Sequence, residues 1–124
     1  MADNKDYMTL PEEHGNIHIA EDVIAAIAVG AAREVEGVSG MMTGMGSVAD
    51  LMTNKKNAQK SAKGVKIEMK EEGLVLDLYL TVNYGTAIPE VAENAQKAVA
   101  AAVEDMAGLT VHAVNIHVGG VTLN

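Results

Sequence analysis

Residues 74–84 read Leu-Val-Leu-Asp-Leu-Tyr-Leu-Thr-Val-Asn-Tyr. Every second residue from Leu74 to Val82 is aliphatic, and most of the residues between them are polar. This period of two predicts a long β-strand with one buried face and one open face. The fold class then depends on which neighbouring segments cover the aliphatic face.

The segments around this strand predict a hairpin and two helices. Residues 65–70 alternate in the same way, and Glu71-Glu72-Gly73 forms the turn between the two strands. The segments 20–38 and 89–106 carry apolar residues at steps of three and four, as amphipathic helices do. Short alternating strands at 16–19 and 111–118 complete the order.

We therefore expect an α+β fold in the order β-α-β-β-α-β. Its sheet is four-stranded and mostly antiparallel, with two helices on one face, a split β-α-β arrangement. Residues 1–13 are expected to form a flexible N-terminal tail. Residues 14–121 are expected to form a single domain with a long loop at 39–64, which is rich in Met, Gly and Lys.

Composition limits the classes of function. The chain has 124 residues and a formal charge of −8, from 9 Lys and Arg against 17 Asp and Glu. Such a charge repels nucleic acids and anionic lipid headgroups. The N-terminus does not resemble a secretory signal, and no apolar stretch approaches the ~20 residues that span a bilayer. We expect a cytoplasmic protein without nucleic-acid binding or direct membrane insertion.

Groups that could carry chemistry are few. No cysteine is present, and the paired carboxylates fall at termini and turns, so we predict neither a catalytic site nor a cofactor. His18 and His117 would stand on the open sheet face, with Asp77 nearby if the first and last strands are neighbours. These three side chains would form a two-histidine, one-carboxylate metal site, but their spacing matches no metal motif. No metal site is therefore predicted, and this trio is kept as the alternative.

Two groups of residues are candidates for an assembly or partner surface. Exposed methionines make adaptable contacts, although the same residues fit equally well as core filler. An open sheet face with free edges offers a second surface, because another copy can pair with it. The candidates are Met41, Met42, Met45 and Met52 in the loop, and Asp77, Tyr79, Thr81 and Asn83 on the open face.

Motifs spread over residues 14–121 resemble one known family. The first is Gly15, Ile17, Ile19 and Val23 before an alanine-rich helix, followed by Glu36-Gly37-Val38 and Gly40-Met41. The others are Gly64-Val65-Lys66, Leu76-Asp77-Leu78-Tyr79-Leu80 with Val82 and Tyr84-Gly85, and the ending from Met106 to Val118. They are similar to those of the alkaline-shock, or Gls-type, envelope stress response family of Gram-positive bacteria.

The resemblance implies a non-catalytic cytoplasmic protein that a membrane-anchored relative holds near the cell membrane. Some members of the family self-associate into filaments or lattices, and others are encoded with fatty-acid synthesis genes. We therefore expect a self-assembling scaffold, a homo-oligomer or filament that acts through the anchored relative. A regulatory or small-ligand module, for example one that modulates a lipid-synthesis enzyme, is the alternative.

Overall fold

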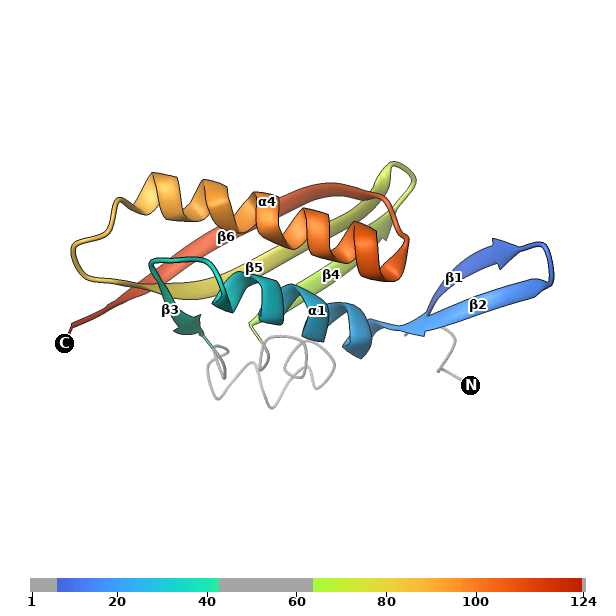
Figure 1. The fold of residues 1–124 in the computed structure, drawn as a ribbon, viewed down its shortest axis with the longest axis horizontal. Helices are drawn as coiled ribbons and strands as arrows, with labels where there is room; N and C mark the ends of the chain where they lie inside the picture. The colour runs from blue at the N-terminus through green and yellow to red at the C-terminus, as the bar shows by residue number, and fades with distance from the viewer. Residues whose placement is uncertain (1–6, 43–63, 124) are drawn as a thin grey trace, which may run out of the picture.

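The computed structural model describes residues 7–42 and 64–123 (Figure 1). Two helices pack on one face of a four-stranded sheet, and a separate two-stranded sheet extends from the body. The predicted α+β class, with a mostly antiparallel sheet, is confirmed. The elements are β1 (Tyr7–Glu12), β2 (Gly15–Ala20), α1 (Glu21–Arg33), β3 (Val38–Met41), β4 (Val65–Lys70), β5 (Gly73–Asn83), α4 (Ile88–Ala107) and β6 (Val111–Thr122).

The main sheet is built on β5. Strands β3 and β4 pair antiparallel with one edge of β5, and β6 pairs parallel with the other edge. The side chains of Leu74, Leu76, Leu78 and Leu80 are fully buried, and Val82 is nearly so. Because side chains alternate along a strand, all five lie on the face that the helices cover. This row is the centre of the hydrophobic core.

Strands β3 and β4 lie end to end along the same edge of β5. Between them, the Met42 N–H donates to the Tyr79 carbonyl at 2.8 Å, and the Tyr79 N–H donates to the Gly64 carbonyl at 2.8 Å. Met42 and Gly64, which flank the segment 43–63 outside the described residues, therefore both bond to one residue of β5.

Helix α4 agrees with its prediction at both ends. Pro89 lies in the first turn, where its missing N–H costs nothing, and Gly108 ends the helix with a left-handed φ of 72°. The buried side chains follow at steps of four: Val91, Ala95, Val99, Val103 and Ala107. Met106, the last residue of the apolar pattern predicted for 89–106, has a side chain that is 72% exposed.

Helix α1 is shorter than its apolar pattern predicts. It ends at Arg33, and residues 34–37 turn the chain so that Val38 can pair with Val82 of β5. Gly37, with a φ of 101°, accepts the Asn83 N–H at 2.8 Å. Val38, expected to end the helical pattern, and residues 39–41, expected to begin the loop, instead form β3. Gly40 and the register shift before it hide the alternating pattern of this short strand.

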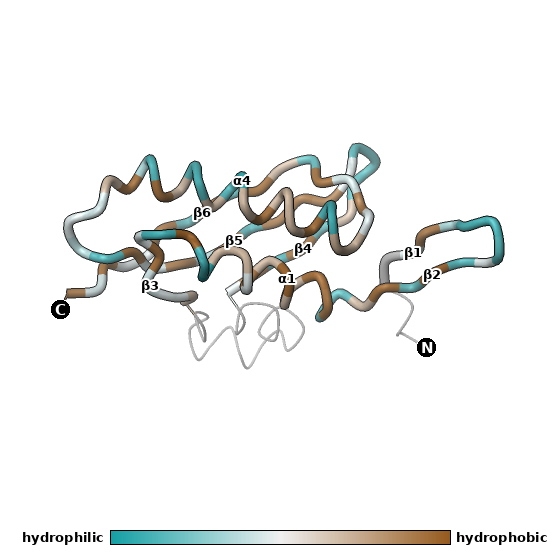
Figure 2. The backbone as a smooth tube through the Cα atoms, in the orientation of Figure 1, coloured by the Kyte–Doolittle hydropathy of each residue, from teal (hydrophilic) through white to brown (hydrophobic). Residues whose placement is uncertain are grey.

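The N-terminal residues also differ from the expectation. Tyr7–Glu12, expected in a tail, form β1 and pair antiparallel with β2. Pro11 is compatible with this strand because both strands of a two-stranded sheet are edge strands, where proline is tolerated. The Leu10 side chain packs against the hydrophobic core. Strand β2 was expected to be one of the four strands of the main sheet. Its place in that sheet is taken by β3. The hairpin projects from the body, and its turn is hydrophilic (Figures 1 and 2).

Strand β6 was expected to end at Val118, but it continues to Thr122. A register shift between Leu80 and Thr81 of β5 leaves Gly119 as an extra residue in β6. Such a bulge changes which side chains face the helices. As a result Val121 lies opposite Val82, on the same face as Val118 opposite Leu80.

Replacing Leu78 by alanine tests the position of the core. The free energy of unfolding should fall by about 2–5 kcal/mol, because buried methyl groups are lost and a cavity remains. Urea denaturation measures the change. The control Met106→Ala alters an exposed side chain and should stay within about 0.5 kcal/mol. Equal losses in both variants would contradict the assignment of the core.

Candidate functional site

The candidate site is the sheet face opposite the helices, which we call the open face. We define it by Ser39 of β3, by Asp77, Tyr79, Thr81 and Asn83 of β5, and by Asn115, His117 and Thr122 of β6. The four β5 residues are half-buried and alternate with the buried leucine row. The structure thus brings the four predicted open-face residues onto one surface.

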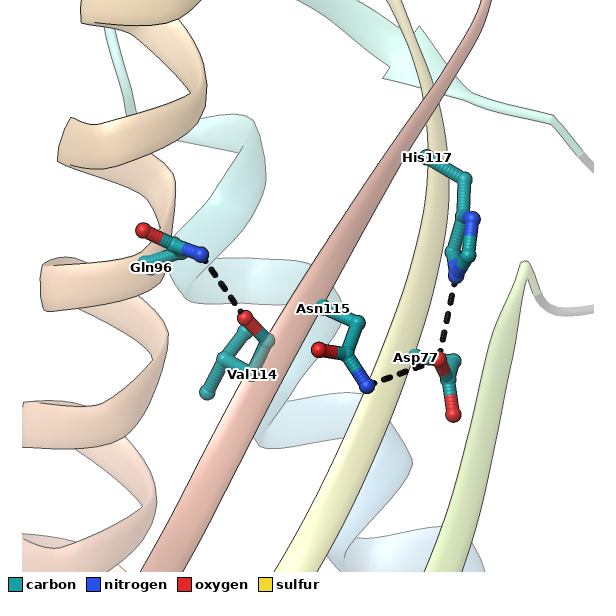
Figure 3. A network of polar contacts seen from close by, with 5 residues as sticks. All are labelled: Asp77, Gln96, Val114, Asn115 and His117. Carbon is teal, nitrogen blue, oxygen red and sulfur yellow. Dashed lines mark hydrogen bonds and ion pairs between the residues drawn. The ribbon is translucent and has the colours of Figure 1, made fainter.

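Asp77 is the centre of a polar cluster between β5 and β6. Its Oδ1 atom accepts a hydrogen bond from Asn115 Nδ2 at 3.1 Å and lies 3.0 Å from His117 Nε2 (Figure 3). The Tyr79 ring stacks on the His117 ring, with centroids 4.4 Å apart. These contacts join residues that the parallel register places opposite one another, Asp77 with Asn115 and Tyr79 with His117. The cluster therefore holds four side chains in fixed positions on the surface.

A second polar cluster joins three strands at the other end of the open face. The Ser39 hydroxyl lies 2.7 Å from the Thr81 hydroxyl and 2.8 Å from the Thr122 hydroxyl. The Thr81 hydroxyl also contacts the Gly40 carbonyl at 3.3 Å. Short side chains bonded in this way lose little conformational entropy when a partner covers them.

The two described methionines of the predicted surface differ in their surroundings. Met41 pairs with Leu80 and packs against both hydrophobic clusters of the core, as the alternative of core filler expects. Met41 follows Val38 at a step of three, and the register shift between Val38 and Gly40 is what brings both side chains to the core face, so no alternating pattern could have placed Met41 there. The Met42 side chain lies against Gly119, where an added methyl group would collide with the methionine sulfur. Met45 and Met52 lie outside the described residues.

The proposed histidine pair does not meet. His18 lies in the separate β1–β2 sheet, where its Nδ1 atom is 3.1 Å from the Thr9 hydroxyl. His117 lies in the main sheet beside Asp77. Within residues 7–42 and 64–123, no three His, Cys, Asp or Glu side chains form a group that could hold a metal ion. The condition for this site, that the first and last strands are neighbours, is not met, because β2 pairs with β1 and β6 pairs with β5.

Several residues of the open face were missed by sequence reasoning. Asn115 shares the alternating pattern with His117 in β6, and this pattern could have identified it. Ser39 and Thr122 carry no such signal, because one lies in a glycine-rich segment and the other follows the bulge at Gly119. The cluster of Ser39, Thr81 and Thr122 forms only when β3, β5 and β6 are paired in the observed register.

A double-mutant cycle on Asp77→Ala and His117→Ala tests the coupling in the first cluster. Both side chains keep contact with solvent, at 25% and 45% exposure, so the coupling energy should be small, about 0.2–1 kcal/mol. Urea denaturation of the four proteins measures it. Strictly additive losses would show that the two side chains do not interact in solution.

Neither helix of the described part is long and apolar enough to cross a membrane.

The chain is similar to several known proteins. The chain is 38% identical to the uncharacterized protein YloU of Bacillus subtilis (strain 168), over 90% of this chain and 92% of that protein. It is 33% identical to YqhY of the same organism, over 94% and 88%. A solved MamM CTD chain is similar with a TM-score of 0.48 and 16% identity, over 81% of this chain and 94% of that one.

A family model matches almost the whole chain. Residues 9–123 match the model described as ASP23 family, cell envelope-related function. The match begins within β1 and includes β2, both described helices and all four strands of the main sheet. The chain therefore belongs to this family of cell envelope-related proteins, the alkaline-shock family that its motifs resemble.

Proposed function

We propose that the protein is a non-catalytic scaffold of the envelope stress response, which assembles with copies of itself and docks to a membrane-anchored relative. The observation that carries the proposal is the open face. Both helices pack on the other side of the sheet, and two bonded clusters fix the side chains of the open face. A face of this kind can pack against another sheet at about 10 Å.

The geometry of the clusters favours binding over catalysis. Asn115 and His117 each bond to Asp77 at the surface, and Ser39 bonds to Thr81. Because these side chains are already ordered, a partner that covers them loses less conformational entropy on binding. This property supports a role in recognition between proteins.

The charge of the chain supports a protein partner at the envelope. A net charge of −8 opposes direct binding to anionic lipid headgroups. An anchored relative overcomes this repulsion, because it supplies the membrane attachment and leaves this chain to make protein contacts. The family's cell envelope-related function is consistent with such an arrangement.

The first experiment measures mass against concentration. Size exclusion with light scattering should show the mass rising well above 12.9 kDa, and negative-stain images of the early fractions should show filaments or regular sheets. A monomer at every concentration would contradict self-assembly.

Tyr79→Lys tests whether copies of the protein contact one another through the open face in large assemblies. A lysine there removes the ring that stacks on His117 and adds a charge to the packing surface. The concentration needed for large assemblies should rise at least about tenfold, which corresponds to about 1.4 kcal/mol. Met106→Lys makes the same change of charge on the exposed side of α4 and should leave assembly unaltered. Equal effects of both substitutions would remove the open face from the proposal.

A further inference from the structure

Strand β6 is a long outer strand of the main sheet. In the part of the chain that the structure describes, β5 is its one strand neighbour. Backbone groups of alternate β6 residues therefore point away from the sheet. Outer strands of this length are usually protected by charged side chains, proline or a covering element.

Helix α4 protects only the first part of this strand. The Leu74 N–H donates to the Thr110 carbonyl, so the next N–H, that of Val111, points outward, and it donates to Glu104 Oε2 at 3.0 Å. Gln96 Nε2 donates to the Val114 carbonyl at 3.0 Å (Figure 3). Both protecting side chains belong to α4.

The second part of the strand lacks this protection by α4. The Tyr84 N–H donates to the Thr122 carbonyl at 2.9 Å, so Thr122 faces β5. Its neighbours Val121 and Leu123 therefore present their N–H groups outward. Among the described residues, no side chain of α4 bonds to these two groups. We call residues 116–123 the β6 edge.

An apolar strip lies beside these backbone groups. The face that buries the leucine row continues past the helices, so Val121 is 48% exposed although its partner Val82 is buried. Tyr84 and Leu123, at the ends of the same two chain segments, are 75% and 72% exposed. Figure 2 shows hydrophobic residues continuing to the C-terminal end of β6. Exposed apolar side chains next to a bare strand edge are typical of a docking site for another strand.

Charge favours a second copy of this chain as the occupant. The β6 edge contains no Asp, Glu, Lys, Arg or Pro, whereas the whole chain carries a charge of −8. Two copies that meet at most other surfaces bring carboxylates together, which costs free energy. At the β6 edge they meet without formal charge and without a side chain that blocks pairing.

We propose that the β6 edge pairs antiparallel with the β6 edge of a second copy, across a two-fold axis normal to the sheet. The pairing joins two main sheets into one and buries Val121 and Leu123 of both copies. This inference rests on the proposed function, self-assembly, and the pairing is the first contact between copies in that assembly. A two-fold contact closes as a dimer, so larger assemblies need a second surface. Because the axis is normal to the sheet, the open faces of both copies lie on the same side of the joined sheet. Together they form the second surface.

Val121→Pro tests the pairing. Proline removes only an outward N–H, so the hydrogen bonds to β5 stay intact, and proline is tolerated in outer strands. The dissociation constant of the dimer, measured by sedimentation, should rise at least about tenfold. The matched control Val121→Ile keeps the N–H, the apolar side chain and the strand preference, and should change the constant less than about threefold. An unaltered dimer in the proline variant would overturn the inference.

Hydrogen exchange of the unaltered protein gives a second test that needs no substitution. Amides of residues 116–123 should gain protection when the protein is concentrated from monomer to dimer. Protection confined to β4, on the opposite edge, would overturn the inference and leave self-assembly standing. An intact dimer protected at β6 that never grows further would support the inference and contradict the larger assembly in the proposed function.

Discussion

The burial of one face of β5 is the constraint on which the rest of the structure depends. Its four leucines are fully buried beneath α1 and α4, and the transfer of each side chain from water contributes about 1.5–3 kcal/mol. Both helices must lie on that face to cover them. The other face of the same strand is consequently left to polar residues, and it becomes the candidate site.

The pairing of β5 with three strands explains how the remaining surfaces arise. One edge is divided between β3 and β4, which meet at Tyr79, and the other edge is taken by β6 alone. The divided edge carries the alternating charges of Lys66, Glu68 and Lys70. The β6 side has no formal charge, and α4 bonds only to its first part. The two edges therefore differ in how readily another strand can add to them.

Much of the fold could be predicted because its strongest signals are local. The leucine alternation identified β5, and Pro89 and Gly108 marked the ends of α4 within a residue or two. The predictions that failed depend on partners distant in sequence. Strand β3 is too short and too rich in glycine to show a pattern, and β2 left the main sheet because its partner is β1. The candidate site divides in the same way, since the β5 residues followed from alternation and Ser39 did not.

The bulge at Gly119 illustrates the difference between local and tertiary information. The sequence alone determined the α+β class, the two faces of β5 and the family, because these follow from side-chain period and from motifs that neighbouring residues carry. Only the tertiary structure decided which residues meet: Asp77 with His117, Ser39 with Thr122, and Val121 beside Val82. The register between strands depends on the packing of the whole sheet, and a shift of one residue moves a side chain to the opposite face.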